Sequence, residues 1–306
     1  MCVTLLELKR SVALGLLTGA VVGWGFVEPW LLQVRRFDVA LENLPPGAEG
    51  MRIVQVSDLH AGLVTPMILT RHILQLAQKE NADLIVLTGD VVSRARSYLP
   101  PIRPPAPPIT EYARRLEPLM RELHAPLGVI AIPGNHDLMF NSENPNPKKR
   151  GDFAPVATYL ESAGIQILDN ANMRLANGLA VIGTDDLREG IPDVRAAVEG
   201  IAPHEAQLVL NHNPRIAALF ADRNALILSG HTHGGQAKLP APLRLNPIDS
   251  ISSPWQSGWW RVGRAQLYVS TGAGHIGGPY RLGVPPEISV FTLLRAKPGD
   301  SRTLPI

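Results

Sequence analysis

The chain has 306 residues, of which 18% are charged, and its formal net charge is +2. This length suits one large α/β domain or two small ones. The small net charge and the absence of a nucleic-acid-binding motif give no basis for nucleic-acid binding. The single cysteine, Cys2, excludes an intrachain disulfide framework and a cysteine metal site. Any metal chemistry must therefore use His, Asp, Glu and Asn side chains.

Residues 12–32 form a nearly continuous apolar run, with Lys9-Arg10 before it and Arg35-Arg36 after it. About 20 apolar residues suffice to cross a bilayer, so the run predicts an N-terminal transmembrane anchor over 1–36, with Glu28 at the membrane interface. A cleaved signal peptide and a buried helix are the alternatives, but no small-x-small cleavage site follows the run. Basic residues on both flanks leave the orientation of the anchor open.

Residues 37–306 are expected to form one domain in which strands alternate with helices. Apolar, β-branched runs predict strands over 51–57, 83–88 and 127–132, and helical spacing predicts helices over 66–78, 118–124 and 154–163. Such alternation is typical of an α/β domain with helix-covered sheets. Shorter strands follow at closer spacing, over 166–168, 173–176, 179–183, 207–211, 225–228, 266–270 and 288–293. Their density predicts a second, more antiparallel sheet, with a hairpin at Asn177-Gly178.

Two segments are predicted to be loops. Residues 100–108 are proline-rich, and residues 141–151 are polar and basic. Each follows a motif described below, so each is placed either to wall a pocket or to be a tolerated surface insertion.

Five predicted strands end in polar, metal-binding residue types. The motifs are Asp58-Leu59-His60, Gly89-Asp90, Gly134-Asn135-His136-Asp137, Asn211-His212 and Gly230-His231-Thr232-His233. In α/β folds the carboxyl ends of strands converge on one crevice. We therefore predict a polynuclear metal site. Its oxygen and imidazole ligands suit Mn, Fe or Zn and disfavour a structural zinc.

The order of these motifs resembles that of the calcineurin-like metallophosphoesterases, over residues from about 51 to 290. The resemblance implies a four-layer α-β-β-α sandwich of two mixed sheets and two divalent metal ions, with Mn the first expectation. Matching the motifs position by position implies that Asp58, His60, Asp90 and His233 hold one ion. It implies that Asp90, Asn135, His212 and His231 hold the other, with Asp90 bridging the two.

The resemblance also implies residues that act on the substrate. His136 is expected to be a general acid or a transition-state donor, whereas Asp137 either takes part or caps the following turn. Ser93 stands where phosphatases of the family carry an aspartate that orients this histidine, which puts that pairing in doubt. Arg94 matches a phosphate-contacting arginine, or is a solvated residue, and His275 and Arg281 are candidates to neutralise a second phosphate.

The closing segment 272–288 resembles a membrane-anchored branch that includes enzymes similar to UDP-2,3-diacylglucosamine pyrophosphatases of lipid A synthesis. We therefore expect an anchored phosphoesterase or pyrophosphatase of the bacterial inner membrane, acting on a phosphorylated and lipid-linked substrate. A secreted phosphatase of soluble phosphomonoesters or wall polymers and a non-catalytic metal-binding scaffold are the alternatives. Trp255, Trp259 and Trp260 either belong to the core or meet lipid or an apolar substrate. The oligomeric state is open.

Overall fold

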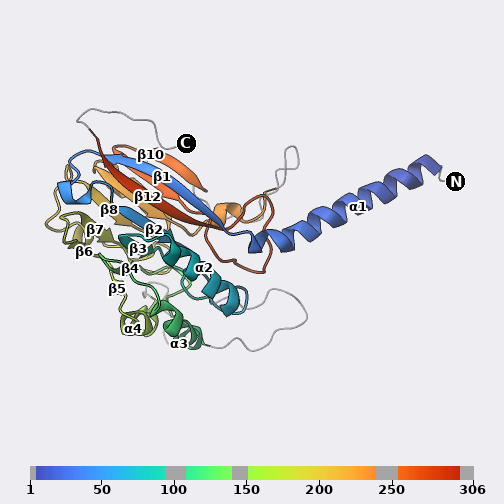
Figure 1. Ribbon diagram of the computed structural model, residues 1–306, viewed down its shortest axis with the longest axis horizontal. Coiled ribbons are helices and arrows are strands. Elements are labelled where there is room, and N and C mark those ends of the chain that lie inside the picture. Colours follow the sequence, from blue (N-terminus) through green and yellow to red (C-terminus); the bar gives the residue numbers. More distant parts are fainter. Residues whose placement is uncertain (1–4, 94–107, 140–150, 239–253, 297–306) are drawn as a thin grey trace.

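A computed structural model describes residues 5–93, 108–139, 151–238 and 254–296 (Figure 1). The predicted loops at 100–108 and 141–151 fall almost wholly outside these ranges, as does Arg94. What is described forms two six-stranded mixed sheets with helices beside them. The α/β class and the two mixed sheets predicted from the sequence are confirmed.

The first sheet has the order β1-β12-β2-β3-β4-β5. Its strands are β1 Gln33–Leu41, β12 Glu287–Arg295, β2 Arg52–Val56, β3 Leu84–Leu87, β4 Val129–Ala131 and β5 Gln166–Ile167. Strands β2 to β5 are parallel, whereas β12 runs antiparallel to β2. The last described strand, β12, therefore lies between β1 and β2. Strand β1 crosses residue 36, where the boundary between anchor and domain was expected.

The second sheet has the order β10-β11-β9-β8-β7-β6. Its strands are β10 Gly258–Val262, β11 Ala265–Val269, β9 Ala225–Ser229, β8 Gln207–Leu210, β7 Ala180–Gly183 and β6 Ala171–Arg174. The Asn177-Gly178 hairpin forms as predicted, because β6 and β7 pair antiparallel across it. Strands β7, β8, β9 and β11 are parallel, so this sheet is less antiparallel than its closely spaced strands suggested.

Helices cover the outer face of the first sheet. They are α2 Met67–Lys79, α3 Ile109–Met120 and α4 Ala154–Ser162, seen below the strands in Figure 1. The second sheet is covered more thinly, by α5 Val194–Ala197 and the 3-10 helix η3 Pro214–Phe220. A dry core between the two sheets joins side chains such as Ile53 and Leu84 to Leu208 and Leu226. The order of layers is thus helix, sheet, sheet and short helix.

The helix predicted over 118–124 is wrong in its bounds, since α3 ends at Met120. The buried residues Tyr112, Leu116 and Met120 recur at helical spacing, so apolar periodicity defines this helix. Pro118 lies in the last turn of α3, where it removes the intrahelical bond that its N–H would make and only two helical residues follow it.

An aromatic cluster closes the inter-sheet core at β1 and β12. The Phe291 ring lies 5.2 Å from that of Tyr268 and 5.8 Å from that of Trp259, with Phe37 stacked at 5.7 Å. Trp259 is therefore a core residue, and Trp255 packs against the other face of the second sheet. The interpretation of these two tryptophans as core residues is supported.

Phe291→Ala should destabilise the domain by about 3–5 kcal/mol, because a fully buried ring leaves a cavity that close-packed neighbours cannot fill. Chemical denaturation followed by fluorescence measures this change. Trp260→Ala is the matched control: Trp260 is 36% exposed, and its loss should cost about 1 kcal/mol or less. A loss below 1 kcal/mol for Phe291→Ala would contradict the assignment of this cluster to the core.

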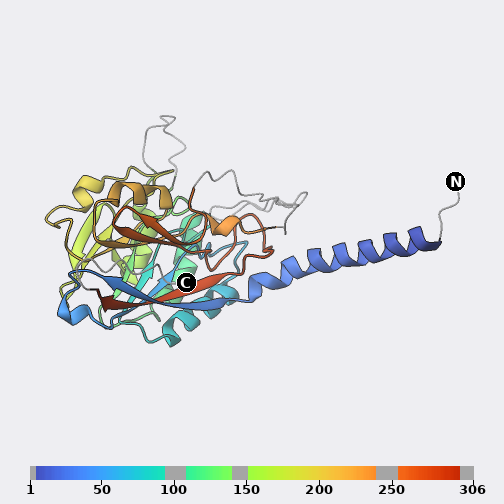
Figure 2. The ribbon, with the colours of Figure 1, turned by 90° about the horizontal axis from the view of Figure 1, so that it is seen from above.

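The N-terminal apolar run is divided between two elements. Helix α1, Leu5–Val27, projects from the domain in both views (Figures 1 and 2), but Glu28–Trp30 turn into the 3-10 helix η1. The Glu28 side chain, expected at a membrane interface, is buried, and its carboxylate accepts a hydrogen bond of 2.8 Å from the Gly283 N–H. Only residues 12–27 of the apolar run are α-helical, and this part of α1 is about 24 Å long against about 30 Å of bilayer core.

The predicted transmembrane helix is accordingly corrected. Within the ranges that the structure describes, no helix combines the length and the apolarity that crossing a membrane requires.

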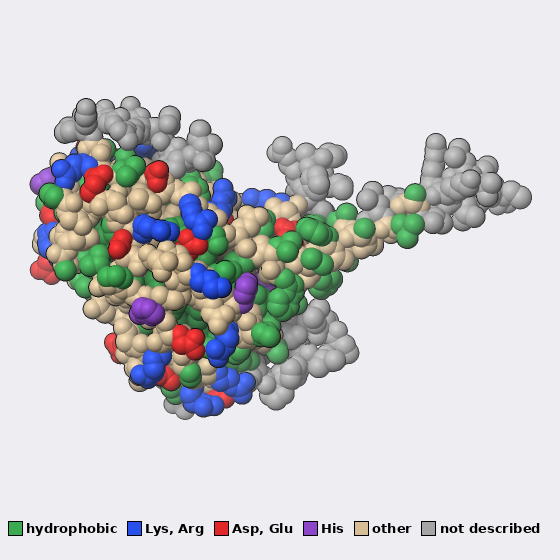
Figure 3. Space-filling view, viewed as in Figure 1, with side chains coloured by type: hydrophobic (Ala, Val, Ile, Leu, Met, Phe, Trp, Pro, Cys, Tyr) green, Lys and Arg blue, Asp and Glu red, His purple; other side chains and the backbone are tan. Residues whose placement is uncertain are grey.

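The base of α1 is fastened to the loop that precedes β12. The Gly25 carbonyl accepts from the Arg281 N–H at 2.9 Å, and the ring of Phe26 meets that of Tyr280 edge-on. Apolar side chains gather around this base in Figure 3. Trp24 and Phe26 on α1 and Trp30 on η1 are each about half exposed. The same end of the domain carries the 3-10 helix η4, His233–Gly235 (Figures 1 and 2).

Candidate metal centre

The polar motifs lie where parallel strands of both sheets end. Asp58 and His60 follow β2, Asp90 follows β3 and Asn135 follows β4, whereas His212 follows β8 and the His231 and His233 pair follows β9. Backbone bonds continue past the strand ends, from the Asp58 N–H to the Gly89 carbonyl and from the Gly230 N–H to the His212 carbonyl. All seven predicted metal ligands are buried, none more than 5% exposed.

The donor atoms of these residues fall into three overlapping groups. Each group has ligand atoms within 4.8 Å of one another: Asp58, His60 and His233; His60, Asp90 and His136; and Asp90, His212 and His231. His231 and His233 belong to different groups. Asp90 belongs to two groups, one with His60, a predicted ligand of the first ion, and one with His212 and His231, predicted ligands of the second. Asn135, an amide, is buried beside them, adjacent to His136.

Imidazole nitrogens face each other across the centre. The Nε2 atoms of His60 and His233 are 3.0 Å apart, and Nδ1 of His231 is 3.2 Å from Nε2 of His212. Asp90 Oδ2 lies between the two pairs, 3.1 Å from His212 Nε2 and 3.5 Å from His60 Nε2, and Asp58 Oδ1 lies beside the first pair, 3.3 Å from His233 Nε2. The second nitrogen of His212 bonds the Thr88 carbonyl, which turns its Nε2 inward.

Five of the seven residues adopt a left-handed backbone conformation. The φ angles are +54° at Asp58, +45° at His60, +53° at Asp90, +71° at His231 and +49° at His233. Non-glycine residues in this region cost about 1–3 kcal/mol each and cluster at functional sites. Strain concentrated on these residues indicates that the fold is organised to aim their side chains inward.

Two glycines allow the motifs to approach one another. A Cβ at Gly134 would lie 2.2 Å from the Asp90 amide nitrogen, and one at Gly230 would lie 2.2 Å from Asp58 Oδ2. Neither position has room for a side chain. The glycines of the Gly-Asn-His-Asp and Gly-His-x-His motifs are therefore needed for close approach as well as for turning.

Burial sets most protonation states in the centre. It lowers the pKa of His60. It also lowers the pKa of His233, to which the charge of the neighbouring His60 contributes. Burial and the charge of His212 together lower the pKa of His231 to about 3. These imidazoles are therefore neutral, with lone pairs available. Burial also raises the pKa of Asp58 to about 6.

Asp90 and His212 form the charged pair of the centre. For Asp90, burial works to raise the pKa, but the facing His212 outweighs it and holds the pKa well below its usual range. For His212, burial works to lower the pKa, but Asp90 outweighs it and holds the pKa well above its usual value. Without a metal ion, a proton on His212 balances the ionised Asp90.

This arrangement fits two divalent cations. The facing nitrogens of each imidazole pair lie close enough to share a proton in a hydrogen bond, or to bind one cation once that proton is lost, and each pair has a carboxylate beside it. A set of imidazoles, carboxylates and one amide suits a borderline or hard divalent ion. Asp90, which contacts both halves, is placed to serve two ions at once.

His136 is less enclosed than the predicted ligands. Its ring is half-buried and meets the His60 ring edge-on at 4.8 Å, while its backbone N–H donates to Asp90 Oδ1 at 2.7 Å. Asp137 is fully buried and accepts from the N–H groups of Val92 and Gly134. These bonds favour the turn-capping interpretation of Asp137.

The substrate contacts predicted at His275 and Arg281 are not supported by their positions. The Arg281 guanidinium is fully buried and donates to the carbonyls of Thr271, Gly272, Gly274 and Val284. His275 is also fully buried, and its N–H donates to Thr65 Oγ1. Both side chains therefore belong to the interior of the loop behind Asp58.

The sequence interpretation missed a pair of buried acids, Asp185 and Asp186, that follow β7. The charge of Asp186 acts on His212, so the pair stands close to the centre. The signal was present, since Thr184-Asp185-Asp186 directly follows a buried strand as the five motifs do. It was overlooked because no histidine accompanies the two aspartates.

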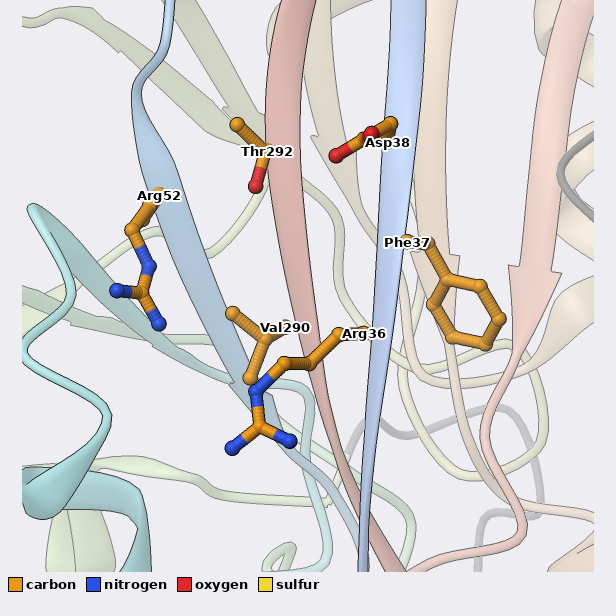
Figure 4. A pocket seen from close by; sticks show the side chains of 6 residues that line it. All are labelled: Arg36, Phe37, Asp38, Arg52, Val290 and Thr292. Atoms are coloured by element: carbon orange, nitrogen blue, oxygen red, sulfur yellow. The ribbon is translucent and has the colours of Figure 1, made fainter.

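A separate hollow of ≈ 550 Å³ lies over β1, β12 and β2, lined by Arg36, Phe37, Asp38, Arg52, Val290 and Thr292 (Figure 4). It includes Arg52, at the opposite end of β2 from Asp58, and none of the predicted ligands. Arg36 and Arg52 both pair with Glu80, which offsets part of their charge. The hollow is not part of the metal centre.

Metal affinity should rise with pH between pH 5 and 7. The raised pKa of Asp58, about 6, means that the metal-free protein keeps a proton that a metal must displace, and His212 holds another. Each displaced proton should weaken affinity about tenfold per pH unit on the acid side of its pKa. Calorimetric titration with Mn²⁺ at pH 5, 6 and 7 checks this, and an affinity independent of pH would contradict it.

Comparisons with known proteins agree with this geometry. A family model described as calcineurin-like phosphoesterase matches residues 51–235, a span that contains all seven predicted ligands. The uncharacterized metallophosphoesterase YkuE of Bacillus subtilis is 29% identical over 295 residues, covering 92% of this chain and 93% of its own. LpxG of Chlamydia trachomatis, a UDP-2,3-diacylglucosamine pyrophosphatase, is 27% identical over 274 residues, covering 76% and 79%. A transmembrane protein with a metallophosphoesterase domain from Danio rerio is 26% identical over 309 residues, covering 94% and 63%.

Proposed function

Because the chain belongs to the calcineurin-like phosphoesterase family and is a metal-dependent phosphoester hydrolase, we propose that it cleaves a phosphoester or pyrophosphate bond in a lipid-linked substrate. UDP-2,3-diacylglucosamine is the candidate substrate, supported by the likeness to LpxG. The observation that carries the proposal is the buried convergence of four imidazoles on Asp58 and Asp90. Such a centre suits phosphoryl chemistry, which depends on positioning and on charge stabilisation.

We assign the ligands as the sequence motifs suggest. Asp58, His60, Asp90 and His233 would hold one ion, and Asp90, Asn135, His212 and His231 the other. Manganese is the proposed metal, with iron or zinc as alternatives, because the donors are oxygen and imidazole. When bound, two such ions lower the pKa of water and neutralise charge on the phosphoryl group.

His136 is the proposed proton donor to the leaving group. Its half-buried ring supports this role, since it is open to substrate while its backbone N–H is fixed by Asp90. A positioned general acid typically contributes about 10²–10⁴-fold in rate. His136→Ala should therefore lower kcat far more for a substrate with a poor leaving group than for an activated aryl ester.

We also propose that the protein associates with a membrane. The half-exposed Trp24, Phe26 and Trp30 support this, because α1 and η1, which carry them, meet the domain at the end that carries η4. The name of the Danio rerio relative points the same way. Cell fractionation tests the proposal: recovery of the full chain in the membrane fraction is expected, and recovery in the soluble fraction alone would refute it.

The decisive test of substrate class is a screen of the purified full chain. Phosphomonoester, phosphodiester and lipid-linked diphosphate substrates are each assayed with Mn²⁺ and with other divalent ions. Preference for the lipid-linked diphosphate supports the proposal, whereas preference for soluble phosphomonoesters would replace it with a general phosphatase. Metal analysis of the same sample should give about two ions per chain.

A further inference from the structure

The loop of residues 184–191 lies between two arms of the metal centre. It leaves the end of β7, and its Thr184 N–H donates to the Leu210 carbonyl, two residues before His212. On its other side, the Glu189 carbonyl accepts from the Gly151 N–H, and Gly151 packs against Leu138, two residues after His136. The loop therefore borders the centre between the strand that carries His212 and the segment that carries His136.

Two buried carboxylates hold this loop rigid. Asp185 accepts from the N–H groups of Asp186 and Ile191, and Asp186 Oδ2 accepts from those of Arg188 and Glu189. Gly190 packs so closely on Asp185 that a Cβ there would lie 2.3 Å from Oδ1. Four backbone donors bound to two carboxylates fix the path of the loop, so the Cα of Arg188 has a defined position.

Arg188 is the cation that this loop presents. Its side chain is 59% exposed, and its backbone N–H donates to Asp186 Oδ2 at 2.7 Å, which places it on the loop that borders the centre. Glu189 is 3.6 Å away, an ion pair at the surface that costs little to break. The guanidinium can therefore turn toward a bound anion without losing a buried partner.

We propose that Arg188 is a specificity residue that binds a second anionic phosphoryl group, the one attached to the phosphorus that is hydrolysed. The inference rests on the proposed function of the centre. Arg188 lies outside the set of proposed metal ligands. It is therefore placed to contact a phosphoryl group attached to the phosphorus atom that reacts. A guanidinium matches phosphate oxygens with two parallel hydrogen bonds, which a lysine cannot reproduce. The rigid loop supplies the positioning that such selectivity needs.

The test compares inorganic pyrophosphate with inorganic phosphate as ligands of the metal-loaded full chain, at fixed free Mn²⁺. Arg188→Ala should weaken pyrophosphate binding about tenfold to a hundredfold, as expected for losing charged hydrogen bonds, and phosphate binding less than about threefold. Arg188→Lys should recover part of the difference. Arg195→Ala, an exposed arginine on α5, is the matched control and should change neither affinity.

Kinetics provide the second readout. With a nucleoside diphosphate diester, Arg188→Ala should raise KM about tenfold or more, whereas hydrolysis of a one-phosphorus aryl diester and metal content should match the wild type. Equal losses for both anions, or no loss for pyrophosphate, would overturn the inference. If the wild type binds metal but hydrolyses neither substrate, the proposed function fails, and the binding comparison still decides the role of Arg188.

Discussion

Asp90→Asn should abolish metal-dependent hydrolysis of an aryl phosphodiester and weaken metal binding by more than about 100-fold. Changes to groups that only orient a ligand cost about 10–100-fold in affinity, and Asp90 is proposed to bind both ions directly. Its Oδ2 lies 3.1 Å from His212 Nε2 and 3.5 Å from His60 Nε2. An amide at this position removes the negative charge and turns a donor toward one of these nitrogens.

The asparagine variant should nevertheless fold, because its remaining oxygen can accept the His136 N–H as Asp90 Oδ1 does. Thermal unfolding with and without Mn²⁺ separates the two effects: the wild type should gain about 2.7 kcal/mol at a metal concentration of 100 Kd, and the variant should gain almost nothing. Asp193→Asn is the matched control, since Asp193 caps α5 and asparagine caps equally well. Full activity in Asp90→Asn would exclude the two-metal assignment.

The convergence of the seven predicted ligands was predictable because it follows from local sequence and one topological rule. Each motif directly follows a buried apolar run, and parallel strands bring their carboxyl ends to one edge. His212 and His60 lie far apart in sequence, yet both contact Asp90. The left-handed φ angles at Asp58 and His231 were not predictable, because Asp and His are enriched in the αL region but still adopt it in only a minority of cases.

The extent of α1 was mispredicted because apolar composition does not say where a chain turns. Glu28 was assigned to an interface as a charged residue at the end of an apolar run. It is instead buried against the loop at Gly283, more than 250 residues away along the chain. The start of helix α3 was misplaced for a similar reason, since Pro118 was taken as a helix start although the buried face of the helix begins at Ile109.

Arg281 was predicted to meet substrate, and the sequence could not reveal its burial because its partners are backbone carbonyls. Those carbonyls exist at every residue, and only the path of the loop brings four of them to one guanidinium. The loop also supports the centre, because the Gly274 N–H donates to the Asp58 carbonyl at 2.8 Å. The side chain thus acts on Asp58 through the backbone.

Arg281→Met should accordingly destabilise the protein by about 1–3 kcal/mol, the cost of leaving buried acceptors without their donor. The thioether cannot donate to the carbonyls of Gly272 and Gly274, which would remain buried without these bonds. The hydrogen bonds from the Arg281 guanidinium to the loop carbonyls act as a clamp on the loop. Loss of this clamp should let the loop move away from Asp58, so metal affinity should fall as well. Denaturant unfolding of the metal-free protein and a metal titration measure the two effects.

The matched control for this variant is Arg264→Met, an exposed arginine paired with Glu42, which should change stability by less than about 1 kcal/mol. Phosphate binding at saturating Mn²⁺ distinguishes the clamp from a substrate contact. If Arg281→Met lowers stability and metal affinity but leaves phosphate affinity of the fully loaded protein within about threefold, the clamp is established. Unchanged stability together with weakened phosphate binding would instead identify Arg281 as a substrate contact. A fully buried guanidinium with four carbonyl partners cannot be removed without a loss of stability.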